Sequence, residues 1–285
     1  MKNASQGGLA VVTGAAGGLG SSFAKKLAER GFRLLLVDRR RAPLDEVCEA
    51  IAAEHGVSAE PYAVDLCKRE EVAQLANRLA QMTDLELLVN NAGYGTVDYF
   101  EDTDPGYLIG MVDLHVVAPT MLTRAVLPGM VERNRGNIIN VSSIGAWFHS
   151  AGNVQYGATK NFLAVFSQSL QQELRGTNVR VQALCPGFVR TGFHAEDSMK
   201  AFKLRRSPAE NLWMTADDVV ECSLRSMHRK RVIVTPGIGY RIVGRLAQMP
   251  FLQPLMQWIT RAPRSVPKPM PRAEAEPVFG IPKKA

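Results

Sequence analysis

A tyrosine and a lysine four residues apart are the side chains of this sequence best suited to proton transfer. Tyr156 and Lys160 lie in the segment Tyr-Gly-Ala-Thr-Lys, and this spacing places both on one face of a helix. A free phenol titrates near pH 10, which is too high for a base at neutral pH, but a nearby ammonium favours the phenolate. We therefore expect Lys160 to lower the pKa of Tyr156 and make it an acid and base for alcohol or carbonyl chemistry. The alternative is a surface tyrosine beside a solvated lysine.

Ser143 is the candidate partner of this pair, 13 residues before Tyr156. It follows a predicted strand, and ligands bind at the carboxyl ends of strands in open parallel sheets. Its hydroxyl could hold a substrate oxygen beside the Tyr156 hydroxyl and stabilise the charge that develops there. Ser142 is a neighbour that could be confused with it, and a serine at a strand end is also often a cap.

A glycine-rich turn follows the first predicted strand and opens the first predicted helix. Glycines in such a turn let a pyrophosphate approach the main chain, and the helix N-terminus offers free N–H groups to it. The spacing is Gly-x3-Gly-x-Gly, so a tight turn without a ligand remains the alternative. The candidate cofactor residues of this turn are Thr13, Gly14, Gly18, Leu19 and Gly20.

Asp38 ends the second predicted strand, 18 residues beyond Gly20. A carboxylate there can accept both ribose hydroxyls of an adenosine and repels a 2′-phosphate, which favours NAD over NADP. Arg39 works against this choice, because an arginine at that position could bind the phosphate. A helix cap or turn aspartate is the alternative role for Asp38.

The hydrophobic pattern alternates between short strands and longer helices, which predicts a doubly wound, mostly parallel sheet of seven strands in one Rossmann-like α/β domain. We expect this domain to cover residues 1–237, followed by an apolar and basic segment, 238–261, and a proline-rich tail, 262–285. Strands are expected at 9–13, 33–38, 58–65, 85–90, 137–142, 178–185 and 231–235, and helices at 18–30, 43–55, 68–82, 105–133, 154–175 and 215–228.

Composition excludes several classes of protein. The chain has 285 residues, of which 46% are hydrophobic, so global disorder is excluded. Its four cysteines form no CxxC pair, which argues against structural zinc and a disulfide framework, and we expect no metal. There is no leader-like segment and no run of 18 uninterrupted apolar residues, so we expect a cytoplasmic protein. The net charge of +7 comes from the C-terminal end, where residues 222–273 hold ten Lys or Arg and no acidic residue, and this argues against a nucleic-acid partner.

Together these motifs resemble the short-chain dehydrogenase/reductase family over residues 9–237. The matching pieces include Thr13–Gly20, Asn90-Asn-Ala-Gly93, Ser143, Tyr156 with Lys160, and Pro186-Gly-Phe-Val-Arg-Thr191. The resemblance implies an enzyme that interconverts a secondary alcohol and a ketone with NAD, our preferred cofactor, or NADP. Besides the glycine turn, Asp38 and Arg39, it implies cofactor contacts from Asp65, Leu66, Asn91, Ala92, Gly93, Tyr156, Lys160, Pro186, Gly187, Val189 and Thr191.

His115 departs from the family pattern, which usually has an asparagine there. In relatives this position helps to hold a water that links the lysine to solvent. If the main-chain carbonyl does so, histidine is tolerated. The imidazole could instead relay protons, since it titrates near neutrality, or it could simply fill space. We include His115 among the catalytic candidates.

The substrate and partners are less defined by the residues. Aromatic residues in the predicted pocket loops, Trp147 and Phe193 among them, suggest a small apolar alcohol or ketone, and the alternative is a lid that packs on itself. Basic residues at 200–206 favour an acyl-thioester (3-oxoacyl) reductase as an alternative, and a cofactor-binding protein without turnover is a third hypothesis. We expect a homodimer or homotetramer. Residues 238–264 could pack on the domain or a second subunit, cap the pocket, or contact a membrane, which the prolines at 250 and 254 make less favoured.

Overall fold

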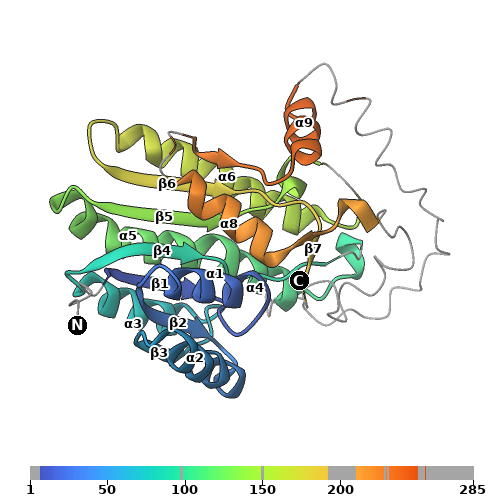
Figure 1. The fold of residues 1–285 in the computed structure, drawn as a ribbon. Coiled ribbons are helices and arrows are strands. Elements are labelled where there is room, and N and C mark those ends of the chain that lie inside the picture. The colour runs from blue at the N-terminus through green and yellow to red at the C-terminus, as the bar shows by residue number, and fades with distance from the viewer. Residues whose placement is uncertain are drawn as a thin grey trace, which may run out of the picture.

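The computed structural model describes residues 7–96, 99–148, 151–191, 210–227, 229, 231–249 and 254. Seven parallel strands form one sheet in the order β3-β2-β1-β4-β5-β6-β9, flanked by helices on both faces (Figure 1). This confirms the predicted fold class. The strands are β1 (Leu9–Thr13), β2 (Arg33–Asp38), β3 (Ala59–Ala63), β4 (Leu85–Asn90), β5 (Gly136–Val141), β6 (Val179–Leu184) and β9 (Ile233–Val234).

Two hydrophobic layers hold the helices on the sheet. Alternate residues of a strand point to opposite faces, so Val12 packs on one layer and its neighbour Val11 on the other. The first layer seats α1 (Gly18–Ala28), α2 (Arg41–His55) and α8 (Ala216–Ser226). The second layer seats α3 (Arg69–Ala80), α5 (Ala118–Glu132) and the end of α6 (Val154–Glu173). The central strands are apolar in succession because both of their faces are covered.

The predicted helix over 105–133 is continuous but contains one turn of different winding. It consists of α4 (Pro105–Val112), a π-helical turn η2 (Asp113–Val117) and α5. Pro119 has no N–H and so cannot donate the α-helical bond to the carbonyl of His115, four residues earlier. A π turn at this point is therefore consistent with the proline. The whole stretch is long and apolar enough to span a membrane, but Leu122 and Met130 lie in the core between the sheet and α3.

The C-terminal part differs most from the prediction. The last strand is only two residues long, because Ile233 and Val234 alone pair with β6. A second, two-stranded sheet, β7 (Val189–Arg190) with β8 (Met214–Thr215), was not predicted. Helix α9 (Ile238–Ala247) follows β9 and ends before Pro250. The proline-rich tail, 262–285, lies outside the described residues. Two short 3-10 turns near the strand ends complete the elements used below, η1 (Phe100–Asp102) and η3 (Ile144–Trp147).

Candidate active site

The sheet reverses its strand order between β1 and β4, and the predicted cofactor residues gather at the carboxyl ends of these two strands. Such a switch point is where ligands bind in doubly wound sheets. Thr13 Oγ1 accepts the N–H groups of Asn91 (2.9 Å) and Ala92 (3.0 Å). Asn91 Nδ2 donates in return to the carbonyl of Thr13 (2.8 Å). These bonds tie the two strand ends together and fix the loop that continues to Gly93.

The glycine turn leaves no room for a side chain at Gly14 or Gly20. Gly14 and Gly18 have φ values of 66° and 58°, in the left-handed region that favours glycine. A Cβ on Gly14 would lie 2.9 Å from the Ala92 Cα, and one on Gly20 would overlap the carbonyl of Gly14. The N-terminus of α1 begins directly after this bare turn, with Leu19 packed against the core. Close main-chain packing at Gly14 and Gly20, next to a helix N-terminus where a Cβ on Gly18 would meet no atom nearer than 3.5 Å, fits the pyrophosphate of a dinucleotide.

Asp38 is buried beside this turn, with 7% of its surface exposed. Its Oδ2 accepts the N–H of Ala16 (3.0 Å), and its Oδ1 accepts the main-chain N–H (3.0 Å) and the Nε (3.2 Å) of Arg40. The carboxylate thus makes the turn-type bond that was the alternative role for Asp38, and it also braces the glycine turn through Ala16. Arg40, rather than the neighbouring Arg39, forms the ion pair with it.

The remaining predicted cofactor residues divide into two groups. The Asp65 carboxylate accepts the N–H of Cys67 (3.0 Å). The side chain of Leu66 is buried in the core, so only its main-chain atoms are available to a ligand.

The second group follows β6, where the carbonyl of Pro186 accepts the N–H of Ile144 (2.9 Å). Val189 lies in β7, and the Thr191 Cβ would lie 3.5 Å from a Cβ placed on Gly18. The Pro186–Thr191 segment therefore closes toward the glycine turn.

Tyr240 of α9 supports the segment after β6 at the edge of the site, and the sequence analysis did not identify it. Its hydroxyl accepts the N–H of Phe188 (3.2 Å) and donates to the carbonyl of Leu212 (2.7 Å). Its ring covers Gly187 so closely that any side chain at that position would overlap it. Its distance in sequence from the recognisable motifs explains why no pattern pointed to it.

Ser143, Tyr156 and Lys160 come together at the carboxyl end of β5 and the start of α6. Ser143 follows β5 and caps η3, and its Oγ accepts the N–H of Gly145 (3.0 Å). Desolvation raises the pKa of Tyr156 above 10, and a hydrogen bond with Ser143 partly opposes this rise. The Nζ of Lys160 lies 5.7 Å from the centre of the Tyr156 ring. All three predicted residues thus share one site.

The structure corrects the expected electrostatics of this pair. Burial lowers the pKa of Lys160 to about 8, and only 4% of its surface is exposed. Its Nζ donates to the carbonyl of Val141 (2.9 Å) and its own carbonyl accepts the hydroxyl of Ser142 (2.6 Å). Desolvation places the pKa of Tyr156 above that of a free phenol, not below it as expected from the sequence. Ser142 anchors the lysine main chain and leaves Ser143 as the serine that contacts Tyr156.

His115 is completely buried between the loop after β4 and helix α6. Its Nε2 accepts the N–H of Tyr94 (3.2 Å), so the proton resides on Nδ1, which contacts Thr159 Oγ1 at 2.9 Å. Thr159 then donates to the carbonyl of Tyr156 (3.1 Å). Burial and the nearby Lys160 lower the pKa of His115 well below 6.5. The ring is a neutral link between the loop after β4 and helix α6, which argues against the proton relay considered from the sequence.

The two candidate substrate residues have different outcomes. Trp147 packs against Gly244 of α9, at 3.6 Å from the position of a Cβ, and against the small core cluster that contains Ala164. These contacts make it part of the wall that carries Ser143. Phe193 lies outside the described residues, as do the basic residues at 200–206.

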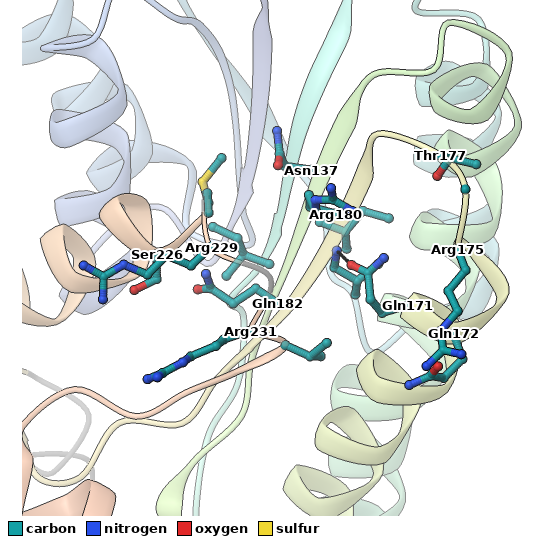
Figure 2. Close-up of a pocket in the computed structure, with 16 residues that line it drawn as sticks. Asn137, Gln171, Gln172, Arg175, Thr177, Arg180, Gln182, Ser226, Arg229 and Arg231 are labelled. Atoms are coloured by element: carbon teal, nitrogen blue, oxygen red, sulfur yellow. Dashed lines mark hydrogen bonds between the residues drawn. The ribbon is translucent and has the colours of Figure 1, made fainter.

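A separate cavity of about 460 Å³ lies at the opposite ends of β5 and β6 (Figure 2). It is lined by Asn137, Arg180 and residues at and just beyond the C-terminus of α6, including Arg175. Arg175 and Arg231 point to different sides in this view, so their guanidinium groups do not converge on one ligand. The cavity lies at the opposite ends of the strands from Ser143, which is not among its lining residues.

Comparison with known protein families decides the identity of this arrangement. Residues 8–201 match the model of the short chain dehydrogenases, which is more than half of the chain. The chain belongs to the short-chain dehydrogenase family. It is accordingly an oxidoreductase that uses NAD or NADP, as the resemblance of the motifs implied.

Individual relatives show how wide this family is. An uncharacterized oxidoreductase of Myxococcus xanthus is 37% identical over 66% of this chain and 75% of its own length. A very-long-chain 3-oxoacyl-CoA reductase of Anas platyrhynchos is 34% identical over 65% of this chain and 61% of its own length. A short-chain dehydrogenase from Sphingobium yanoikuyae, solved in complex with NADPH, is 27% identical with a TM-score of 0.76, and the match covers 91% of this chain and 97% of that one.

Proposed function

We propose that this short-chain dehydrogenase interconverts a secondary alcohol and a ketone on an apolar substrate, with Tyr156 as the acid and base. The observation that carries the proposal is the convergence of Ser143, Tyr156 and Lys160 at the carboxyl ends of the central strands, beside a glycine turn shaped for a dinucleotide. When bound, the nicotinamide supplies the site with a hydride donor or acceptor.

Each side chain of the site is assigned a separate role in the reaction. Ser143 and Tyr156 offer two hydroxyls to one substrate oxygen, which orients it and stabilises negative charge on it. In the reducing direction the phenol is protonated at neutral pH, as an ordinary phenol is, and it can give its proton to the oxygen. The Lys160 ammonium, held by the carbonyl of Val141, stabilises the phenolate that remains.

We expect Asp38 and Arg40 to oppose each other in the choice of coenzyme. The carboxylate disfavours a 2′-phosphate, whereas the Arg40 guanidinium, paired with it and 3.8 Å from the position of a Cβ on Gly17, favours one. Asp38→Asn keeps an acceptor for the Ala16 N–H and removes the charge. It should shift the ratio of kcat/KM for NAD over NADP toward NADP by about tenfold, which corresponds to about 1.4 kcal/mol. Arg40→Ala should shift the same ratio toward NAD.

Steady-state kinetics with both coenzymes measure these two shifts. A change in the same direction for both variants would contradict the opposed roles. Unchanged Tm values in the two variants would show that the glycine turn is still braced.

His115 is expected to act as a positioning residue that keeps the loop after β4 against α6. His115→Asn can still reach Thr159, and His115→Gln can still reach the Tyr94 N–H, so each should keep kcat within about threefold while raising the KM for the coenzyme about three- to tenfold. His115→Leu breaks both bonds and leaves the Tyr94 N–H without its acceptor, a cost of about 1–3 kcal/mol in the free energy of unfolding.

A pH profile separates positioning from proton relay. Lys160, Tyr156 and Tyr94 are titratable groups around the ring, and the neutral imidazole should leave the shape of the kcat profile between pH 6 and 9 the same in His115→Gln. A profile that loses an ionisation in this variant would show that the imidazole itself carries protons.

An acyl-thioester (3-oxoacyl) reductase is the second candidate function. It is favoured by the similarity to the very-long-chain 3-oxoacyl-CoA reductase, although the match covers 61% of that protein. A panel of ketones, secondary alcohols and 3-oxoacyl thioesters, followed by NADH and NADPH absorbance, distinguishes the two. Turnover of thioesters alone would replace the first proposal, and coenzyme binding without any turnover would favour a protein that binds the cofactor without catalysis.

We also propose that the chain forms a homodimer or homotetramer. Support comes from α5 and α6, where Val131, Val154 and Val165 are exposed apolar side chains. Light scattering of the purified protein tests this assembly.

A further inference from the structure

Helix α9 has two faces with different surroundings. Its inner face is made of small or aromatic residues that pack on the wall of the site. Gly244 and Ala247 are buried, Gly244 lies against Trp147 and Ile144, and the Tyr240 hydroxyl is bonded to the main chain of Phe188 and Leu212. The helix is therefore fixed to η3, the turn that directly follows Ser143. It stands at the periphery of the molecule, away from the seven-stranded sheet (Figure 1).

The outer face of α9 is apolar and open to solvent. Its apolar residues are three, four or five positions apart, and such spacings place them in a continuous arc on one side of the helix. The exposed fractions of these side chains range from 38% to 73%, and the arc consists of Ile238, Ile242, Val243, Leu246 and Met249. Buried residues of the same types would stabilise the fold, whereas a cluster of this kind in solvent marks an interaction surface.

Positive charge lies directly beside the apolar arc. Arg241 and Arg245 are both exposed and occupy the side of the helix between the arc and the inner face. Their surroundings in sequence are also basic, since residues 222–273 contain ten Lys or Arg and no Asp or Glu. Arginine heads beside an apolar stripe match the headgroups and the acyl region of an anionic bilayer.

The structure also removes the main objection to a membrane-binding helix. Pro250 and Pro254 were expected to interrupt any helix in this segment, but α9 ends at Ala247, before Pro250.

A second copy of the chain is the competing occupant of this face. The exposed apolar side chains of α5 and α6 offer a second copy another surface to bind. Self-association would also bring the Arg241 and Arg245 side chains of two copies close together if the α9 faces met around a twofold axis, which is unfavourable.

We propose that the outer face of α9 is a peripheral membrane-binding surface that inserts its apolar arc into anionic bilayers. The helix would then lie in the plane of the interface, with the wall that carries Trp147 and Ser143 next to the lipid. An apolar substrate dissolved in the bilayer would meet the site without crossing water. This surface goes beyond the proposed function, and its test does not depend on turnover.

Co-sedimentation of the full chain with vesicles tests the surface. We expect binding to vesicles that contain 30% phosphatidylglycerol in phosphatidylcholine, and at least tenfold weaker partitioning to pure phosphatidylcholine. The double variant Ile242→Ser/Leu246→Ser should lose partitioning by at least tenfold. Arg241→Gln/Arg245→Gln should lose about fivefold for each arginine, and this loss should shrink at 0.5 M salt because the charges are screened.

Ile109→Ser is the matched control. Ile109 is a 48% exposed isoleucine on α4 without this arginine flank, and its replacement should leave partitioning unchanged. Light scattering of all variants identifies the competing occupant. The proposal would be overturned if the α9 variants bound vesicles as well as wild type does. It would also be overturned if wild type did not bind vesicles. A fall in subunit number in the α9 variants without a change in vesicle binding would assign the surface to a second copy instead.

Discussion

Tyr156→Phe is expected to lower kcat by about a thousandfold, within the range that positioned acid–base groups contribute. The substitution removes one oxygen and keeps the ring, which lies near Lys160 and His115. Without the phenol, no group on the Tyr156 ring can donate the proton to the substrate oxygen. Ser143 remains but serves as a holding group. Steady-state kcat in the reducing direction measures the loss.

Coenzyme affinity is the control for this variant. The glycine turn and Asp38, which are proposed to hold the coenzyme, are unchanged in this variant, so the Kd for NAD or NADP, from quenching of protein fluorescence, should stay within about threefold. Ser143→Ala gives the comparison, with an expected loss of about a hundredfold because stabilisation of charge on the oxygen is removed while proton transfer remains. A Tyr156→Phe enzyme with more than a tenth of the wild-type kcat would refute the assignment of Tyr156.

The fold could be predicted because the strand signals were local. Leu34 to Val37 and Leu87 to Val89 are apolar in succession, and the structure buries them on both sides of the sheet. Element ends were less predictable, because they depend on pairing. The strand around 231–235 has the right residue types, but only Ile233 and Val234 find a partner in β6.

The proximity of the candidate site residues could be predicted, but their electrostatics could not. The spacing of Tyr156 and Lys160 correctly places them near each other, since both are on α6. The amount of water around each group depends on residues far away in sequence, and this burial raises the pKa of Tyr156 and lowers that of Lys160. A sequence pattern gives the sign of a pairwise charge effect and leaves out the desolvation that opposes it.

Tertiary contacts explain the residues that were missed. Thr159 looks like an ordinary helix residue, yet it joins His115 to the main chain of Tyr156. Gly93 matched the family pattern, but its physical reason became visible only in three dimensions, because a Cβ there would lie 2.7 Å from His115 Nε2 and 3.2 Å from Lys160 Nζ. Such constraints arise between segments that no local window includes.

Lys160→Met is expected to lower kcat by about a hundredfold or more without lowering the free energy of unfolding at pH 7.5 by more than about 1 kcal/mol. Activity falls because the ammonium that stabilises the phenolate is lost. Stability holds because burying the charge costs the native protein about 3 kcal/mol, from a pKa of about 8 against 10.5 in the unfolded chain. Methionine removes that cost and offsets the loss of the hydrogen bond to the carbonyl of Val141.

The lowered pKa of Lys160 also predicts how the free energy of unfolding changes with pH. Between pH 8 and 10.5 the unfolded chain holds a proton on Lys160 that the native protein has released, so this group makes wild type more stable as the pH rises. From pH 7.5 to 9.5, wild type should therefore gain about 2 kcal/mol relative to Lys160→Met in denaturant unfolding. Lys25→Met, which removes an exposed lysine paired with Glu54, should show no such gain. If wild type and Lys160→Met changed in parallel with pH, Lys160 would not be buried with a lowered pKa, and its ammonium would act on Tyr156 through solvent.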